Sequence, residues 1–165
     1  MKQSVRLMMV LGCVCMVALM SACATSAQTV VSTAVGPAQT RSVSTASTGK
    51  LVVYSAPTVT TVEQARYPVH TPYTLSDASG KMLQEVDNRT GFFDSSPVTL
   101  PLAAGSYFVK ALAAGRGYVV VPVRIEPGKT TIVDLDGTAM PQNVTADSRY
   151  VRLPDGHIVG YRANE

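Results

Sequence analysis

The side chains that most often perform chemistry are sparse in this sequence of 165 residues. It has two histidines, His70 and His157, and neither has a cysteine or a carboxylate at the spacing of a metal site. The Gly-x-Ser-x-Gly motif of serine hydrolases does not occur. We therefore expect no catalytic residue, no metal and no cofactor, with His70 on the polar side of its strand and His157 in solvent.

Two pairs of acidic residues are the remaining candidates for chemistry. Asp134 and Asp136 flank one residue at the end of an expected strand. Calcium requires more oxygen ligands than two carboxylates supply, so we expect an exposed strand end. An enzyme site built from Asp87, Asp94 or His157 would need partners that tune an acid or a base, and the sequence shows none. We expect a protein that is not an enzyme.

Two adjacent aromatic residues, Phe92 and Phe93, lie in the loop between Asp87 and Asp94. One such ring often packs beneath its own loop, whereas an exposed ring would be a contact point for a partner. Both residues are therefore candidates for partner binding.

The charge of the chain is nearly balanced. The full sequence has a net charge of +3, and without Lys2 and Arg6 it has 12 basic and 11 acidic residues. No basic stripe is present, so nucleic acid is not indicated as a partner.

The first 22 residues have the three parts of a secretory signal. Lys2 and Arg6 form a basic start, the 14 residues 7–20 are apolar and uncharged, and the small residues Ser21 and Ala22 follow. A transmembrane helix would need about 20 apolar residues, so the run is too short to span a bilayer. The segment predicts export.

The stretch LMSACATSAQ at residues 19–28 offers two processing sites. Met20-Ser21-Ala22-Cys23 resembles the lipobox of bacterial lipoproteins, and this resemblance implies that Cys23 is acylated and becomes the first mature residue. The several acyl chains of that family would meet the requirement of two membrane signals for stable anchoring. Ala24 after the cysteine favours the outer membrane. The alternative is ordinary signal peptidase cleavage after Ala24, which would remove the cysteine.

Residues 23–48 are expected to be the lipidated cysteine and a flexible linker. Ser, Thr and Ala dominate residues 24–48, and Arg41 is the only charged residue there. Such a segment buries too little apolar surface to offset its ordering entropy. The alternative is a short strand around Val30 and Val31.

Residues 49–136 predict an all-β domain. Short runs of β-branched and aromatic residues alternate with turn signals, and none has a helical period. Pro122 has no backbone donor, so its strand is expected at a sheet edge or with a bulge. Seven strands at this spacing predict a small antiparallel immunoglobulin-like sandwich. The expected strands are 51–55, 69–76, 81–86, 98–100, 106–112, 119–125 and 130–135.

Several stretches of this domain share a pattern of turn residues and strand residues with a known group of modules. They are Gly49-Lys-Leu-Val-Val-Tyr-Ser-Ala-Pro57, Ala104-Gly105-Ser-Tyr107-Phe-Val109 and Ile125-Glu-Pro-Gly128-Lys-Thr-Thr-Ile-Val133. Together they resemble PEGA and carboxypeptidase-regulatory-like modules over about residues 49–136, although the Pro-Glu-Gly-Ala signature is missing after Ser55. The resemblance implies a prealbumin-like sandwich and a non-catalytic envelope or accessory module.

Residues 137–165 are expected to form a link and a C-terminal β-hairpin. A Pro-Asp-Gly turn at 154–156 joins two alternating runs. An isolated hairpin is marginal in water, so it either packs on its own sandwich or pairs with a partner. In the second case Tyr150, Val151 and Ile158 would be offered by strand addition.

These features together predict a bacterial cell-envelope lipoprotein, most simply at the outer membrane, with its domain in the periplasm or at the surface. The membrane, through the lipid, and an envelope protein are the expected partners. The β-sandwich would serve as a structural or protein-interaction module. The alternative function is binding of carbohydrate or peptidoglycan.

Overall fold

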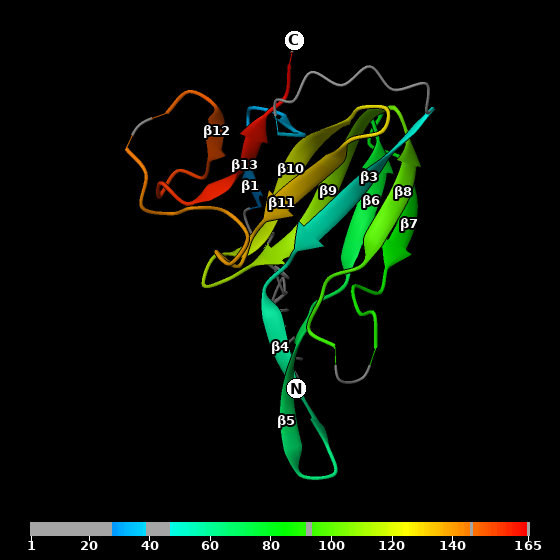
Figure 1. Ribbon diagram of the computed structural model, residues 1–165, viewed down its shortest axis with the longest axis vertical. Coiled ribbons are helices and arrows are strands. Elements are labelled where there is room, and N and C mark those ends of the chain that lie inside the picture. The colour runs from blue at the N-terminus through cyan, green and yellow to red at the C-terminus, as the bar shows by residue number, and fades with distance from the viewer. Residues whose placement is uncertain (1–27, 39–46, 92–93, 146, 165) are drawn as a thin grey trace, which may run out of the picture.

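The computed structural model describes residues 28–38, 47–91, 94–145 and 147–164, which form an all-β sandwich (Figure 1). No helix in these ranges is long and apolar enough to cross a membrane. The strands are β1 (Thr29–Val30), β2 (Val35–Gly36), β3 (Thr48–Tyr54), β4 (Pro57–Val62), β5 (Ala65–His70), β6 (Tyr73–Asp77), β7 (Met82–Val86), β8 (Thr99–Ala103), β9 (Gly105–Ala113), β10 (Gly117–Ile125), β11 (Thr130–Asp134), β12 (Tyr150–Arg152) and β13 (Ile158–Arg162).

Two sheets face each other across the core. The large sheet has the order β12-β13-β2-β10-β9-β6-β7, with β1 also paired to β10, and the small sheet has the order β11-β3-β8. The strands β4 and β5 pair only with each other among the described strands. Most pairings are antiparallel, as expected, but β1 and β2 pair in parallel with β10, and β11 pairs in parallel with β3. The predicted all-β sandwich is confirmed, and these parallel pairings occur beside its antiparallel ones.

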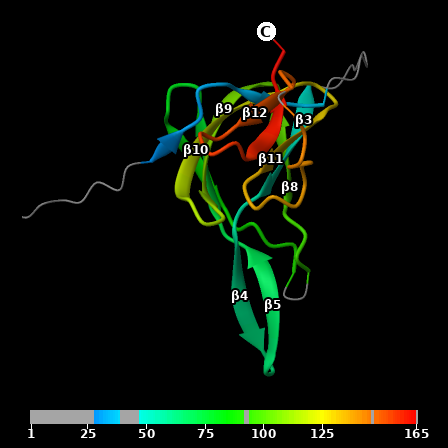
Figure 2. The same ribbon diagram turned by 90° about the vertical axis from the view of Figure 1, so that its left-hand side faces the viewer.

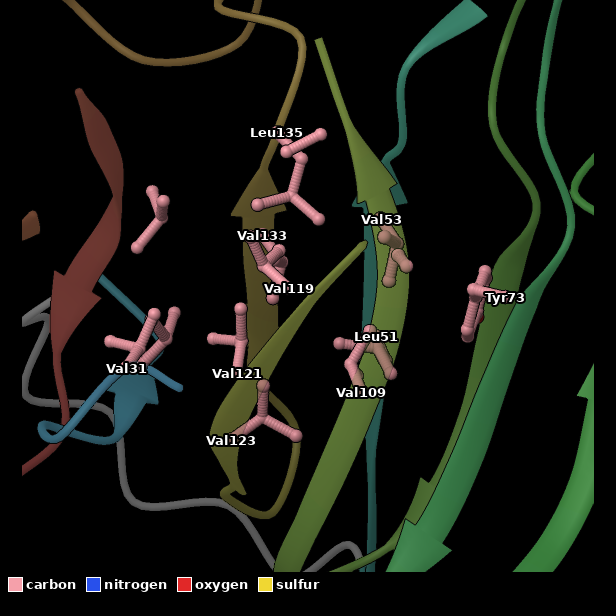
Figure 3. Close-up of a cluster of buried hydrophobic side chains, with 14 of the residues drawn as sticks. Val31, Leu51, Val53, Tyr73, Val109, Val119, Val121, Val123, Val133 and Leu135 are labelled. Atoms are coloured by element: carbon pink, nitrogen blue, oxygen red, sulfur yellow. The ribbon is translucent and has the colours of Figure 1, made fainter. Parts of the chain in front are cut away.

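The core lies between the inward faces of both sheets (Figure 3). Val109, Val119 and Val121 from the large sheet and Leu51 and Val53 from the small sheet are each 0% exposed. The alternation in β9 and β10 thus places the odd-numbered residues of 109–113 and 119–125 inside, because successive side chains of a strand point to opposite faces.

The segment expected as a linker is partly built into the sandwich. Its residues Val31 and Val35 are buried in the core, and Val35 pairs with Val123 of β10. The prediction of a flexible linker is therefore wrong for residues 29–37, while residues 23–27 and 39–46 lie outside the described ranges. Parallel pairing with β10 buries this segment, although its local composition alone did not predict burial.

Pro122 also differs from expectation, because β10 lies inside the large sheet rather than at its edge. On one side of β10 the partner changes from β1, opposite Val119 and Val120, to β2, opposite Val123. Pro122 falls between these pairings, where a missing backbone donor is tolerated.

The C-terminal hairpin packs on its own domain. The strand β12 pairs with β13, and β13 pairs with β2 through Tyr161 and Arg162. Of the two alternatives for residues 137–165, the structure shows the one in which the hairpin extends the large sheet.

Candidate interaction site at the base of a projecting hairpin

The hairpin β4–β5 projects from one end of the sandwich as an arm (Figures 1 and 2). Its register runs from Pro57 opposite His70 to Val62 opposite Ala65. No other described strand pairs with either outer edge of the arm. The arm was not predicted, because no strand was expected between residues 55 and 69 and residues 69–76 were expected to form one strand. Thr71 and Pro72 instead separate β5 from β6.

The local sequence explains why the arm is a hairpin. The run Pro57-Thr-Val-Thr-Thr-Val62 is rich in β-branched residues and carries no charge. Glu63 and Gln64 form the two-residue turn, with φ angles of 48° and 70°. Positive φ at both positions is the requirement of a type I′ turn, whose twist matches that of the flanking strands.

A cleft of about 390 Å³ opens where the arm joins the sandwich. It combines apolar surfaces, hydroxyl groups and one histidine–carboxylate pair. None of the described residues that line it is a lysine or an arginine. The lining residues are Tyr54, Pro57, Pro68, Val69, His70, Ser95, Ser96, Pro97, Asp136 and Thr138.

His70, which was expected on the polar side of its strand, is buried at the floor of this cleft. Its side chain is 8% exposed, and that of Asp136 is 6% exposed. The His70 Nδ1 atom lies 2.6 Å from the carbonyl oxygen of Ser55 and 3.8 Å from Asp136 Oδ2. The ring of Tyr54 packs edge-on against the imidazole, with 5.6 Å between centroids.

The carbonyl of Ser55 fixes the tautomer of His70. A carbonyl oxygen only accepts hydrogen bonds, so Nδ1 carries the proton and donates. In a neutral ring with this tautomer, Nε2 would be an acceptor. Among the described residues Tyr73 Oη is the one fully enclosed side-chain polar atom without a partner. His70 is one of the residues that line the cleft.

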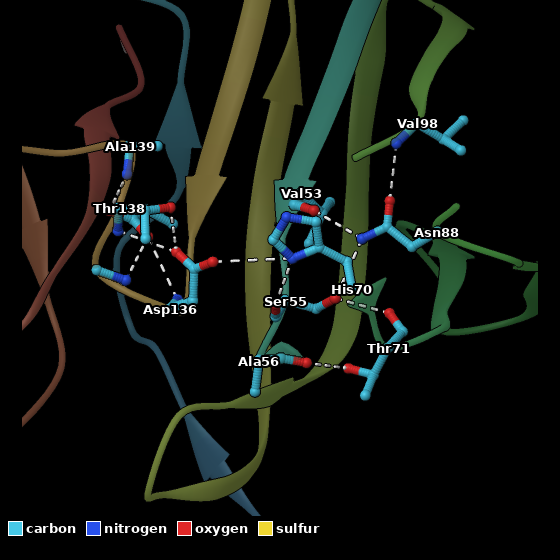
Figure 4. A network of polar contacts seen from close by, with 12 residues as sticks. Val53, Ser55, Ala56, His70, Thr71, Asn88, Val98, Asp136, Thr138 and Ala139 are labelled. Atoms are coloured by element: carbon cyan, nitrogen blue, oxygen red, sulfur yellow. Dashed lines mark hydrogen bonds and ion pairs between the residues drawn. The ribbon is translucent and has the colours of Figure 1, made fainter. Parts of the chain in front are cut away.

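A polar network holds the base of the arm to the small sheet (Figure 4). The Ser55 hydroxyl donates to the carbonyl of Thr71 at 2.6 Å, and the Thr71 hydroxyl donates to the carbonyl of Ala56 at 2.9 Å. Asn88 Nδ2 donates to the carbonyl of Val53 at 2.7 Å and to Ser55 Oγ at 3.1 Å. Buried polar groups satisfied in this way fix a unique arrangement of the segments that carry them.

Asp134 and Asp136 are buried, which corrects the expectation of an exposed strand end. Asp134 is 0% exposed, and its Oδ2 accepts hydrogen bonds from the backbone N–H groups of Ala139 and Met140. Burial raises the pKa of the Asp134 carboxyl, the backbone donors of Met140 and Gly137 oppose this, and Asp136 adds to the rise. Asp136 Oδ1 accepts from the N–H and hydroxyl of Thr138, which leaves Oδ2 toward His70.

The groups considered for an enzyme site have separate local partners. Asp87 pairs with Arg89 at 2.8 Å, and Asp94 accepts hydrogen bonds from Thr90 and from the backbone N–H of Ser96. The ring of His157 is half-buried, with Nε2 3.1 Å from the carbonyl oxygen of Asp134. No contact in the described part of the chain joins these groups into one site, and no group of three metal-ligating side chains occurs there.

The residues proposed for partner binding fall into three classes. Val151 and Ile158 are 2% and 0% exposed, so in this fold their side chains contact their own core instead of a partner. Tyr150 is half-buried, with its ring 5.2 Å from that of Tyr161. Phe92, Phe93 and the proposed lipidation site Cys23 lie outside the described residues.

Comparisons with protein-family models, with curated proteins and with solved structures found no match. The arm and the cleft therefore rest on the geometry of this chain alone. The signal that could have revealed the arm is the β-branched run 57–62, followed by two polar residues and a second run with Tyr67 and Val69.

Proposed function

We propose that this protein is a bacterial cell-envelope lipoprotein whose β-sandwich is a non-catalytic protein-interaction module. The secretory pattern of residues 1–22 and the lipobox-like residues before Cys23 support anchoring through lipid. The arm and the adjoining cleft support the interaction with a protein partner. The resemblance to PEGA and carboxypeptidase-regulatory-like modules agrees with this assignment.

The observation that carries the proposal is an uncharged strand with an open edge next to a cleft. Exposed edges are usually protected by charge, proline or a covering segment, because they pair readily with other strands. After Pro57, β4 has none of these protections among the described residues. An extended partner segment would pair along its six residues, a length of about 20 Å. The cleft would receive one of its side chains.

The test places a photo-crosslinking residue at Val59 on the arm, which is 52% exposed. The matched control carries the same residue at Ser79, in an exposed turn on another part of the domain. We expect a discrete envelope-protein adduct from position 59 and none from position 79.

A variant with a shortened arm tests whether the arm itself makes the contact. Replacing residues 59–68 by Asn-Gly removes the exposed edge together with Pro68 of the cleft wall, and keeps the pair Thr58–Val69 and His70 at the cleft floor. An excess of the wild-type domain should compete with the adduct, and the shortened domain should not. Equal competition by both would exclude the arm as the contact element.

The intact mass of the mature chain tests the anchor separately. We expect a chain that begins at Cys23 and carries fatty acyl groups. An unmodified chain that begins at Thr25 would exclude lipid anchoring.

The cleft favours binding of carbohydrate or peptidoglycan as a second function. His70 Nε2 and Asp136 Oδ2 would act as acceptors toward a ligand in the cleft. Saccharide hydroxyls would supply donors, while the ring of Tyr54 and the lining prolines would pack against the C–H faces of a sugar. Co-sedimentation of the protein with purified peptidoglycan tests this, and we expect His70→Gln to reduce the bound fraction. Equal sedimentation with and without peptidoglycan would exclude it.

A further inference from the structure

The outward side of the large sheet carries a group of apolar side chains around Lys110, and we name this group the outer face. Its members alternate along β9 and β10 with residues that are fully buried in the core, so they point away from the core. Val30 is 65% exposed and Tyr118 is 54% exposed, and the other members are half-buried. The outer face consists of Val30, Phe108, Leu112, Tyr118, Val120 and Pro122.

The strand register makes these side chains neighbours. Val30 lies opposite Val120 across β1 and β10, and Tyr118 lies opposite Leu112 across β10 and β9. Residues opposite each other in paired strands share one face and lie within contact distance. The solvent side of an antiparallel sheet is ordinarily polar, and a contiguous apolar patch marks an interaction site.

The N-terminal chain connects this face to the proposed anchor. Residues 24–28 are all that separates Cys23 from Thr29 at the start of β1. Even fully extended, this stretch spans only about 20 Å. Lipid on Cys23 would therefore hold β1, and with it Val30 of the outer face, close to the bilayer surface. Figure 2 shows β1 on the same side of the domain as β9 and β10.

The charges around the outer face suit lipid headgroups. Lys110 belongs to β9 between Phe108 and Leu112, and its Nζ lies 5.6 Å from the centre of the Tyr118 ring. Arg124 lies opposite Ser106 at one end of the same side of the sheet and is exposed. Tyrosine and lysine have apolar bodies and polar ends, which places them at membrane interfaces.

We propose that the outer face rests on the bilayer beside the acyl anchor, so that the large sheet contacts lipid and the arm remains free for a protein partner. This inference depends on the proposed function through the lipid on Cys23. The occupant is an anionic lipid surface, because the anchor confines the domain to the bilayer and the charged side chains of β9 and β10 on this side, Lys110 and Arg124, are basic. The exposed Glu85 shares this side of the sheet but lies two strands away from Lys110, on β7.

A tryptophan reporter tests the proposal, because the chain contains no tryptophan. The full mature protein carrying Tyr118→Trp is placed in vesicles of phosphatidylethanolamine and phosphatidylglycerol, with and without bromine on the acyl chains. The control protein carries Val59→Trp on the arm. We expect a blue shift and a loss of emission in brominated vesicles for position 118 and neither change for position 59.

The possible failures are distinguishable. The mass of each protein is measured first, so an unmodified N-terminus would reject the anchor whatever the fluorescence shows. An acylated protein whose emission at position 118 is the same in both kinds of vesicle would reject contact of the outer face with lipid and leave the anchor intact. A dimer in sedimentation experiments that shields position 118 from bromine would also reject it, because a second copy would then cover the face.

Discussion

Gly160 of β13 lies directly against Val35 of β2, so an N-terminal and a C-terminal segment of the described chain are packed closely together. A Cβ atom built on Gly160 would come 2.5 Å from Val35 Cγ1 and 2.7 Å from the carbonyl oxygen of Ile132. Real Cβ atoms do not approach other atoms so closely, and one of these neighbours is backbone. The contact joins the N-terminal segment, the small sheet and the C-terminal hairpin into one unit.

Gly160→Ala is therefore expected to lower the free energy of unfolding by about 1–3 kcal/mol, because an added methyl group in a filled core forces the backbone to move. Urea denaturation of the full mature chain measures the change. Gly91→Ala is the control, since among the described residues its added Cβ would meet only Asp94 Cβ, at 3.9 Å. Equal stability of Gly160→Ala and wild type would show that β2 and β13 are packed more loosely than these short contacts imply.

Tyr73→Phe is expected to raise the free energy of unfolding by about 1 kcal/mol, because an unpaired buried hydroxyl is unfavourable. The Tyr73 side chain is 2% exposed, and its Oη has no partner among the described residues. Burial also raises the pKa of Tyr73 above its ordinary value. Tyr107→Phe is the matched control: it loses a 3.0 Å hydrogen bond to the carbonyl of Ala103 and should be destabilised instead. A loss of stability in Tyr73→Phe would mean that Oη has a bound partner, such as a water molecule.

Asn88→Ala is expected to destabilise the protein by about 2–3 kcal/mol, because it leaves buried backbone groups without partners. Asn88 is 0% exposed and also accepts a hydrogen bond from the N–H of Val98 at 3.0 Å. Asn88→Asp keeps this acceptor but replaces the donor to the Val53 carbonyl by an oxygen. The loss of stability caused by Asn88→Asp should become smaller as the pH falls and the new carboxyl gains a proton. A defect independent of pH would argue against the role of Nδ2 as donor.

The free energy of unfolding should depend on pH partly through the titration of Asp134. Its pKa is raised in the folded state, so the folded protein binds the proton more tightly than the unfolded chain. The stabilisation from this proton is full below the unfolded pKa of about 3.9 and is lost as the pH rises through the raised folded pKa. Asp134→Asn removes the stabilisation that comes from this proton. It also places an amide donor toward the backbone N–H groups that Asp134 accepts from. The stability difference between wild type and Asp134→Asn should therefore be larger at pH 4 than at pH 7 in urea denaturation. The opposite trend would show that the backbone donors dominate and lower the pKa.

The turn of the arm should respond to residues that favour positive φ. Replacing Glu63 by Asn and Gln64 by Gly is expected to stabilise the hairpin by about 1 kcal/mol, because other residues are strained in this region. Hydrogen exchange of the amides of β4 and β5 should slow, while the exchange of β10 stays the same. Faster exchange in the arm would contradict the type I′ turn.

The sequence by itself determined the all-β class and the inward faces of the long strands. In β10 the apolar residues Val119, Val121, Val123 and Ile125 alternate along the expected strand 119–125, and all four are buried. Alternation is a local property with a period of two residues, so it can be read without knowing what the strand packs against.

Only the tertiary structure decided which polar residues are buried and which segments complete the sheets. His70 and Asp136 are 66 residues apart in the chain, and they meet because the arm returns beside the end of β11. Val35 is held by β10 and β13, both distant in sequence, in a segment whose composition alone indicated a linker. Burial of these residues depends on contacts between remote segments, and a local pattern carries no information about which remote surface will cover it.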